Sequence, residues 1–426
     1  MNPTNRVYPL DVIRTLALHV QGLTTKLDIK NKPTSEMIYN IIKCIGCLQI
    51  DTLSVVQRSQ YLVLWSRLGQ YNIDDSDKLL FGDQAGNGNN RRLFEYWLHG
   101  ASIIPLDGYR YRLPVMRKYK EQGDKWNQGW SKKKENVALM NNILERIKRD
   151  GPIRSADFEN DGPKRGSWWD WKPAKQALEQ LYNRGDLMIA NRINFQRIYD
   201  LRERVLPDWV NTSEPSSDET IRYLLESALL SLGVCQKSQI ADYTHMRRTK
   251  ANSFIENLIA DAVFIKIQAC LSDHKAHELL IHRDNISLLE RIADRELKAR
   301  RTTFLSPFDS LFWAKGRDVQ LWNFSQVLEA YKPESSRKWG YFCLPILYHD
   351  KLVGRFDPKL NRKTNTLHIK ALYLEPNIQL DEKLVNAVAG AMRDFMKFHN
   401  ATDLIIERSE PLEFRNQLLS NFTSIR

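Results

Sequence analysis

Cysteine is scarce in this chain: its 426 residues contain five, at positions 44, 47, 235, 270 and 343. This set is odd in number and sparse, whereas small secreted proteins held by disulfides carry a dense and paired set. No stretch approaches the roughly 20 consecutive apolar residues that span a bilayer. The N-terminal residues also lack the continuous apolar core and small-residue cleavage site of a signal peptide. We therefore expect no membrane insertion and a location in the reducing cytoplasm.

Signatures of nucleotide and metal chemistry are also missing. The sequence has no G-x-x-x-x-G-K-[ST] phosphate loop and no G-x-G-x-x-G after a strand-like segment. No G-x-S-x-G stretch offers a serine nucleophile. Cys44 and Cys47 have the spacing of half a zinc site, but no second pair completes the four ligands of a structural zinc. We expect no nucleotide cofactor, no other organic cofactor and no metal ion.

Positive charge is in excess. Lys and Arg number 63 against 51 Asp and Glu, a net charge of +12, which favours a polyanionic partner such as nucleic acid. Residues 108–134 concentrate nine of these cations among tyrosines and tryptophans. Because basic groups contact phosphates and aromatic faces stack on bases, we expect a DNA-binding surface here. The alternative is a solvated connector whose aromatic residues pack on the protein. The candidate DNA contacts in this segment are Arg110, Arg112, Arg117, Lys118, Lys132 and Lys133.

One supersecondary pattern occurs twice. In residues 136–210 a helical pattern is followed by the turn GPIRSADF, a short helix, a further helical pattern and an alternating hairpin pattern. The same order recurs in residues 211–301 around GVCQKSQIADY. This is the element order of a winged helix, and its repetition predicts a tandem. The region 1–135 is helical and contains a candidate third, degenerate copy, and 302–426 is strand-rich with a terminal helix. The predicted class is α+β, with tandem winged-helix (helix-turn-helix) units followed by a β-rich C-terminal domain.

Two polar residues in the N-terminal region are candidates for chemistry. The β-branched stretch LQIDTLSVV, from Leu48 to Val56, predicts an extended segment. In extended backbone, side chains two residues apart project to the same side, so Gln49 and Asp51 would share a site that offers an amide and a carboxylate. The alternative is that Asp51 only caps the following turn through its side-chain oxygen.

Five long segments carry a resemblance to a known family. They read LQIDTLSVVQRSQYLVLWSRLGQY, RRLFEYWLHGAS, WWDWKPAKQALEQLYNRGDLMIANRINFQRIYDLRERVLP, FLSPFDSLFW and WGYFCLPILYHDKLVGRFDPKLNRKTNTL. In this order the chain resembles the AlkZ/YcaQ family of bacterial winged-helix DNA glycosylases, from about Tyr8 to Leu374. The resemblance implies tandem winged helices, a β-rich C-terminal domain, excision of alkylated purines and unhooking of DNA interstrand crosslinks. It also implies double-stranded DNA with alkylated or crosslinked guanine as the substrate.

The motif in LQIDT resembles one branch of that family. The family's catalytic motif is Gln-x-Gln in one branch and Gln-x-Asp in the YcaQ branch, and Gln49-x-Asp51 is similar to the second. That branch implies N7-alkylguanine and crosslinked substrates. Two positions depart from the pattern, since Gln60 and Gly100 stand where relatives often have a histidine and an acidic residue. Roles of those two side chains are therefore not carried over.

The chemistry of alkylated purines explains so sparse a motif. N7-alkylation makes guanine cationic and a good leaving group, so no strong general acid is needed. The enzyme has to stabilise an oxocarbenium-like sugar and place a water against C1′. Asp51 suits both tasks, and the Gln49 amide can position the same water. No lysine stands out as a Schiff-base nucleophile, so we expect a monofunctional glycosylase that leaves an abasic site. We also expect a monomer, because the lesion is asymmetric.

Further DNA contacts are expected outside the basic segment. A crosslinked base cannot rotate into a tight pocket, so we expect an open channel rather than full base flipping. His99 is expected to face this channel, with a purely structural histidine as the alternative. Arg355 and Asp357 are expected to form a structural ion pair. The remaining candidate DNA contacts are Arg58, Arg165, Arg192 and Arg197.

Two other classes of protein fit the same sequence features. A non-enzymatic winged-helix transcriptional regulator would use the basic surface for sequence-specific binding, usually as a dimer. A protein-interaction scaffold would show negligible salt-dependent DNA binding. The net positive charge weighs against the scaffold, whereas only the family resemblance separates the enzyme from the regulator. The expected setting is the bacterial cytoplasm, with the substrate in the nucleoid.

Overall fold

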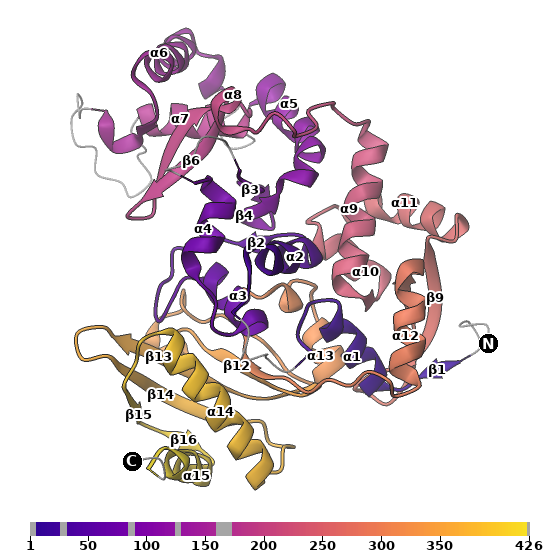
Figure 1. Ribbon diagram of the computed structural model, residues 1–426. Coiled ribbons are helices and arrows are strands. Elements are labelled where there is room, and N and C mark those ends of the chain that lie inside the picture. Colours follow the sequence, from indigo (N-terminus) through magenta and orange to yellow (C-terminus); the bar gives the residue numbers. More distant parts are fainter. Residues whose placement is uncertain (1–5, 26–31, 84–89, 124–128, 159–172, 424–426) are drawn as a thin grey trace. The chain divides into compact units, whose positions relative to one another are not determined.

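The computed structural model describes residues 6–25, 32–83, 90–123, 129–158 and 173–423 (Figure 1). The chain divides into two compact units, and it passes from one to the other at four points. Unit 1 comprises Met1–Ile73, Leu98–Ser102 and Leu224–Arg426, and unit 2 comprises Asp74–Trp97 and Ile103–Tyr223. Each unit buries apolar residues of its own. Within the described residues, no helix combines the length and apolarity needed to cross a membrane.

Unit 2 contains all described residues of the basic segment, 108–134. Its helices are α4 (Ile73–Phe81), α5 (Leu113–Gln122), α6 (Lys134–Asp150), α7 (Pro173–Asn183) and α8 (Arg202–Val205). Its strands are β5 (Ile153–Arg154), β6 (Leu187–Ile193) and β7 (Gln196–Leu201). The strands β3 (Leu93–Leu98) and β4 (Gly100–Pro105) begin and end in unit 2, while the tip of their hairpin belongs to unit 1.

Unit 1 contains the remaining elements. Its helices are α1 (Leu10–His19), α2 (Ser35–Ile45), α3 (Ser59–Leu68), α10 (Lys237–Tyr243), α11 (Arg248–Ala260), α12 (Ile286–Ala293), α13 (Arg317–Trp322), α14 (Glu382–Phe398) and α15 (Leu412–Thr423), and α9 (Ser217–Leu232) runs into it from unit 2. Its shorter strands are β1 (Val7–Tyr8), β2 (Leu48–Gln49), β8 (Val234–Cys235), β9 (Phe264–Cys270) and β10 (Ala276–His282). The C-terminal strands are β11 (Thr302–Phe304), β12 (Leu344–Tyr348), β13 (Lys351–Asn361), β14 (Thr366–Leu374), β15 (Asp403–Ile406) and β16 (Ser409–Glu410).

One arrangement of elements occurs three times. In each copy a helix is followed by a two-residue strand, further helical turns and a hairpin, and the short strand pairs with the second strand of that hairpin. The strand orders are β2-β4-β3, β5-β7-β6 and β8-β10-β9. In the N-terminal region this arrangement begins at α2 and ends with β4. Helix α1 packs instead against α12 and α13.

A glycine marks the same point in each copy. Gly46, Gly151 and Gly233 follow the first helix, with φ angles of +78°, +89° and +74°. An L-residue in this left-handed conformation brings its Cβ close to the following carbonyl, whereas glycine has no Cβ. The helix therefore ends at a sharp turn, and the next two residues are extended and free to pair with the hairpin.

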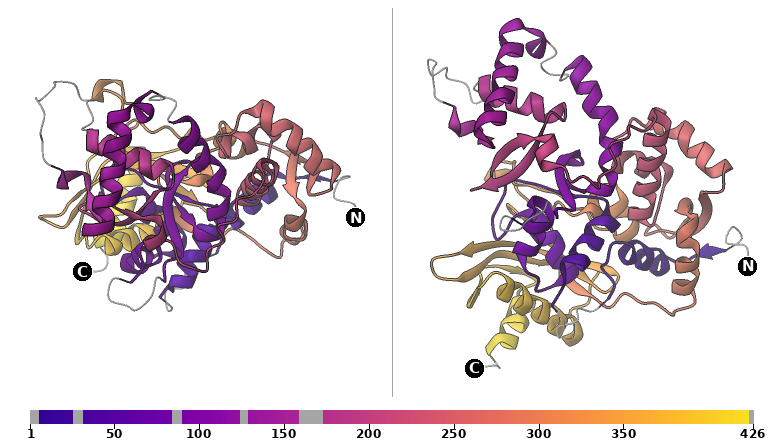
Figure 2. Two further views of the ribbon diagram at one scale, coloured as in Figure 1. Left: turned by 90° about the horizontal axis from the view of Figure 1, so that it is seen from above. Right: turned by 45° about the horizontal axis from the view of Figure 1, so that its top comes forward.

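The C-terminal part of unit 1 is a mixed sheet with the order β11-β12-β13-β14-β15, and β16 pairs with β14. Helix α14 lies along one face of this sheet (Figures 1 and 2), with Leu384, Val388, Met392 and Phe395 among its buried residues. Aromatic rings join this helix to α3, since the Phe395 ring lies 4.9 Å from Trp65 and 5.5 Å from Phe304 between ring centres.

A buried ion pair connects α3 to the turn before α13. Arg67 and Asp309 have fully buried side chains and form two hydrogen bonds of 2.6 and 2.9 Å. Arg67 also donates to the carbonyl oxygen of Gln21, at 3.0 Å. Removing one partner from such a pair leaves an uncompensated buried charge, which costs about 3–5 kcal/mol. These contacts place α3, and the segment that precedes it, on the C-terminal part of the chain.

Candidate active site

The segment that holds Gln49 and Asp51 is extended. Buried hydrogen bonds fix its start, because the Tyr243 hydroxyl donates to the carbonyl of Ile45 at 2.8 Å. The Ile50 amide then donates to the carbonyl of Ala101 at 2.7 Å. Ile50 is buried, while Gln49 and Asp51 on either side of it are half-buried. This alternation means that Gln49 and Asp51 share the side of the segment opposite to Ile50.

The Gln49 side chain lies beside the tip of the β3–β4 hairpin. Gly100, at φ +70°, faces this amide, since a Cβ at this position would be in ordinary van der Waals contact with it, 3.6 Å from Nε2 of Gln49. An acidic side chain at position 100 would therefore project against the Gln49 amide. Within the described parts of the chain that amide has no hydrogen-bond partner, so its donor and acceptor are both free to bind a ligand or a water.

Asp51 uses one of its two carboxylate oxygens within the protein. Oδ1 accepts a hydrogen bond from the Leu53 amide at 2.8 Å. This is the turn-capping contact expected as the structural alternative, and it fixes the orientation of the carboxylate. Oδ2 makes no hydrogen bond to any residue that the structure describes. The turn and a chemical role are therefore compatible, because each uses a different oxygen.

The residues after Asp51 form a loop that is tied at both ends. Arg58, half-buried, donates from Nη1 to the carbonyl of Thr52 at 3.3 Å, and it forms an isolated β-bridge with Ser54. The Arg362 guanidinium donates to the carbonyl of Val56 at 2.8 Å. Arg58, a predicted DNA contact, thus also has a structural role in closing this loop.

His99 lies in an aromatic cluster at the hairpin tip. Its ring stacks on Trp313, with ring centres 4.0 Å apart and an angle of 6° between the planes. The His245 ring meets it edge-on, with the two Nε2 atoms 3.4 Å apart. Burial, followed by the neighbouring His245, lowers the pKa of His99 to about 4. His99 is therefore neutral at pH 7, and its stacking holds Gly100 next to Gln49.

Tyr331 is a residue of this region that sequence reasoning missed. It lies in the loop between α13 and β12, and its ring is 72% exposed. The pKa of Tyr331 is raised by partial burial and then by the charge of Asp51. An exposed aromatic ring within electrostatic range of Asp51 offers a stacking surface for a base or a sugar. No sequence pattern distinguishes this tyrosine from the other fifteen.

Arg355 and Asp357 do not pair with each other, so that prediction was wrong. Arg355 donates to Glu375 at 2.8 Å, and its guanidinium lies 4.0 Å from the centre of the Phe324 ring. Asp357 instead accepts hydrogen bonds from the amides of two residues before β12, Tyr341 and Phe342. Although residues two apart on a strand share a face, each of these side chains has a different partner, Arg355 the carboxylate of Glu375 after β14 and Asp357 the amides of the segment before β12.

The predicted contacts in unit 2 differ in their surroundings. Lys118, Lys132 and Lys133 are exposed. Arg112 is buried, whereas Arg110 and Arg117 form ion pairs with Glu219 and Glu214 at 2.9 and 3.0 Å. Arg192 forms two hydrogen bonds to Glu95, and Arg197 forms two to Glu179. Arg165 lies outside the described residues.

Two aromatic residues of the basic segment pack within unit 2. Tyr109 is fully buried. Tyr111 is stacked on Tyr223, with ring centres 3.6 Å apart and an angle of 7° between the planes. Neither ring is available to stack on a base, so these two residues match the structural alternative for this segment.

The comparison with protein families defines the class of protein. The family model described as "DNA glycosylase AlkZ-like" matches residues 42–398. The chain belongs to this family, and it is a DNA glycosylase, a hydrolase of N-glycosyl bonds that acts in DNA repair. The enzyme class and the family predicted from the sequence are therefore confirmed.

A solved structure gives the fold. The chain is similar to the Streptomyces sahachiroi DNA glycosylase AlkZ, with a TM-score of 0.61 and 11% sequence identity over 95% of this chain and all of that chain. At this identity the likeness shows the fold alone. It confirms the α+β class predicted from the sequence.

Proposed function

We propose that this glycosylase excises N7-alkylated purines and unhooks DNA interstrand crosslinks, with Asp51 and Gln49 as its catalytic residues. The observation that carries the proposal is the pair of uncommitted polar groups, Oδ2 of Asp51 and the amide of Gln49, on one side of an extended segment. They are the two residues of the Gln-x-Asp motif. The family supplies the reaction class, and the geometry supplies the groups for it.

In this mechanism the C1′–N9 bond breaks and the electron pair leaves with the cationic base, which becomes neutral. Oδ2 of Asp51 stabilises the positive sugar and then accepts a proton from the water whose oxygen bonds to C1′. The Gln49 amide accepts a hydrogen bond from that water and donates one to the substrate. The products are the free alkylated base and an abasic site. No lysine addition takes part, so the enzyme is monofunctional.

The winged-helix tandem and its DNA contacts are part of the same proposal. Each of the three repeated arrangements corresponds to one winged helix, and the divisions at 135/136, 210/211 and 301/302 mark the domains. Lys118, Lys132 and Lys133 are the first choice for phosphate contacts, because they are exposed. Four of the predicted arginine contacts are paired with glutamates in the free protein, so to bind DNA each would have to release its glutamate and pair with a phosphate instead. They are Arg110, Arg117, Arg192 and Arg197. The enzyme acts as a monomer in the bacterial cytoplasm and excises the lesion in an open channel.

The test compares wild type with Asp51→Asn on defined duplexes that contain N7-methylguanine or a nitrogen-mustard crosslink. Both proteins are used at equal DNA occupancy, and base release and unhooking are measured. Loss of a positioned general base predicts a rate lower by about 10²–10⁴-fold. Asp208→Asn, a change at an exposed carboxylate in unit 2, serves as the matched control and keeps the wild-type rate. If wild type and Asp51→Asn both bind DNA and neither excises, a regulator accounts better for the chain.

A further inference from the structure

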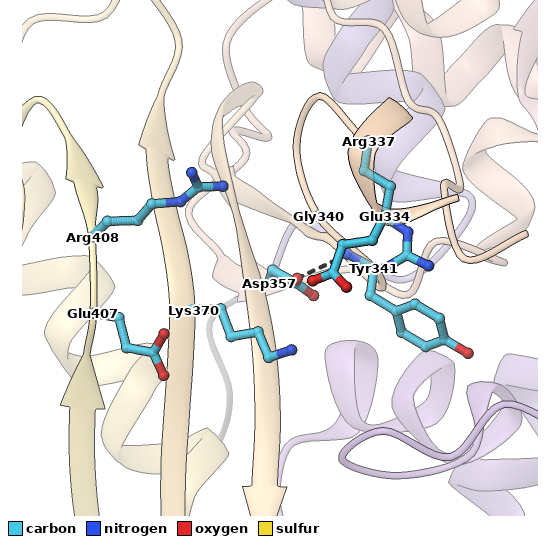
Figure 3. A pocket seen from close by; sticks show the side chains of 8 residues that line it. All are labelled: Glu334, Arg337, Gly340, Tyr341, Asp357, Lys370, Glu407 and Arg408. Atoms are coloured by element: carbon cyan, nitrogen blue, oxygen red, sulfur yellow. Dashed lines mark hydrogen bonds between the residues drawn. The ribbon is translucent and has the colours of Figure 1, made fainter. Parts of the chain in front are cut away.

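Two adjoining hollows lie on the C-terminal part of unit 1. Their volumes are about 440 and 520 Å³, and they share Tyr341, Asp357 and Lys370 (Figure 3). The second hollow also reaches Thr52 and Leu53, the two residues that follow Asp51. The shared walls make one continuous groove, named here the C-terminal groove, that begins at the Asp51 turn and crosses β13 and β14.

The C-terminal groove contains more available positive than negative charge. Its cations are Lys359, Lys370, Arg337 and Arg408. Its carboxylates are Glu334, Glu407 and Asp357. Both oxygens of Asp357 accept backbone amides, from Tyr341 at 2.8 Å and from Phe342 at 2.9 Å. The two carboxylate oxygens of Asp357 therefore already have partners within the protein, and the groove carries four cations against three carboxylates.

Lys370 is directed into the groove by an irregularity in the sheet. Asp357 pairs with Ala371 and Pro358 pairs with Ile369, so Lys370 is the extra residue of a β-bulge in β14. A bulge re-aims a side chain, and bulges are frequent next to active sites. Figure 3 shows the Lys370 side chain extended from its strand toward the side on which Asp357 and Tyr341 lie. Lys370 and Lys359 are exposed and have no partner within the described residues.

The opposite wall is a loop that buried carboxylates hold in place. Glu329, 3% exposed, accepts hydrogen bonds from the amides of Lys338, Trp339 and Gly340 and from Lys332 Nζ. Burial opposes ionisation of Glu329, but these donors outweigh it and lower its pKa to about 2. The loop is therefore ordered before any ligand arrives.

The ordered loop presents two groups to the groove. The Arg337 guanidinium lies 4.9 Å from the centre of the Tyr341 ring. A cation over an aromatic face, next to a free lysine, can hold a phosphate and the sugar or base attached to it. The wall thus combines electrostatic attraction with a flat apolar surface, which is the combination that nucleic-acid strands require.

We propose that the C-terminal groove binds the sugar–phosphate backbone of the lesion-bearing DNA strand on one side of the excised nucleotide, with Lys370 contacting a phosphate. The inference rests on the proposed function, because the Asp51 turn gives the groove its position relative to the lesion. Glu334 and Glu407 at the rim oppose binding of additional phosphates, so they limit the groove to a short stretch of backbone.

The test uses full-length protein and duplexes that contain a stable abasic-site analogue. Affinity is measured by salt titration for wild type, Lys370→Ala and the control Lys383→Ala, a change at an exposed lysine of α14 outside both hollows. One lost phosphate contact predicts a fall of about 0.9 in the slope of log affinity against log salt concentration. We expect this fall, with several-fold weaker binding, for Lys370→Ala only.

A second perturbation identifies the phosphate. Single phosphates flanking the analogue are replaced, one at a time, by neutral methylphosphonates. At one or two adjacent phosphates, the methylphosphonate should lower the DNA affinity of wild type. The same replacement should leave the already weaker affinity of Lys370→Ala unchanged. Lack of such coupling at every position, with an unchanged salt slope, overturns the inference. The inference is also overturned if an excess of a deoxynucleoside monophosphate displaces the duplex as effectively as unlabelled duplex does. The groove would then be a site for small nucleotides.

Excision is assayed in parallel on alkylated DNA. If wild type excises nothing, the proposed function fails, and the phosphate coupling still decides whether DNA occupies the groove. If wild type excises but coupling is lacking, only the groove assignment fails. Lys370→Gln, which keeps most of the side-chain length, separates loss of charge from loss of packing.

Discussion

At the scale of single residues, the proposed mechanism gives the Asp51 carboxylate two tasks. Oδ1 holds the turn through the Leu53 amide, and Oδ2 is available for chemistry. Asparagine retains an oxygen that can accept the Leu53 hydrogen bond, whereas alanine does not. The two substitutions therefore separate the structural task from the catalytic task.

We expect Asp51→Asn to change the free energy of unfolding by less than about 0.5 kcal/mol and Asp51→Ala to lower it by about 1 kcal/mol, the value of one hydrogen bond. Both should abolish most base release. Urea unfolding and the excision assay measure the two effects. Equal stability of both variants would show that the turn contact is not needed, and excision by either variant would contradict the catalytic assignment.

At the scale of elements, the tip of the β3–β4 hairpin positions Gln49 through its neighbour. His99 stacks on Trp313, and the next residue, Gly100, lies against the Gln49 amide. A ring at position 99 is needed for this stack, but an ionisable nitrogen is not. The role inferred for His99 is therefore positional.

We expect His99→Ala to lower kcat by on the order of tenfold with little change in DNA affinity, because small misplacements of a reacting group slow catalysis more than binding. His99→Phe should restore most of the rate by stacking on Trp313. Single-turnover excision and equilibrium DNA binding measure this split. A phenylalanine variant as slow as the alanine variant would assign the imidazole itself a chemical role.

The glycines that end the first helix of each repeat offer a second test at this scale. A Cβ at Gly151 would meet nothing within 4 Å, whereas one at Gly233 would lie 3.0 Å from Val20 and 3.3 Å from the Leu16 carbonyl. Gly151→Ala should cost only backbone strain, about 1–3 kcal/mol, because Gly151 has φ +89° and ψ −165°, and Gly233→Ala should add a steric cost to its strain. Gly390→Ala, inside α14 with open space, should be neutral or stabilising. Thermal unfolding of the three variants measures the change in stability of each, and we expect the largest loss for Gly233→Ala and the smallest for Gly390→Ala.

Much of this element structure could be predicted from the sequence, and the limits have physical causes. Helical and alternating periods indicated the repeated arrangement, and the extended LQID stretch placed Gln49 and Asp51 on one side. The contribution of Tyr331 and Lys370 was not predictable, since one lies in an irregular loop and the other is aimed by a β-bulge. The partners of Arg355 and Asp357 depend on strand register, which adjacent sequence letters do not encode.

At the scale of the whole molecule, buried histidines set the response to acid. Burial lowers the pKa of His19, His99, His282 and His399, with His99 at about 4 and His399 at about 3. An unfolded histidine titrates near 6.5, so between these values the unfolded chain binds more protons than the folded one. Their contribution to stability is present above pH 6.5 and is lost as pH falls through the folded pKa values.

His399 provides the measurement. His399 is 7% exposed and stays neutral in the folded protein at pH 5, whereas it is protonated in the unfolded chain. This difference lowers the free energy of unfolding by about 2 kcal/mol between pH 7 and pH 5. Between pH 7 and pH 5, the free energy of unfolding should decrease in both proteins. We expect the decrease in His399→Leu to be smaller than in wild type by about 2 kcal/mol. His274→Asn, at an exposed histidine with positive φ, is the control. Parallel pH profiles for wild type and His399→Leu would contradict the assignment.

The four crossings of the chain between its units have a consequence for synthesis on the ribosome. Gln49 and Asp51 emerge early, but β1 pairs with β9, and Arg67 is paired with Asp309. Unit 1 therefore cannot close around these residues until more than two hundred further residues, including all of unit 2, have been translated. A nascent chain that ends before Asp309 therefore lacks the contacts that hold the proposed site, and base-releasing activity is expected only after the segment through Asp309 has been made.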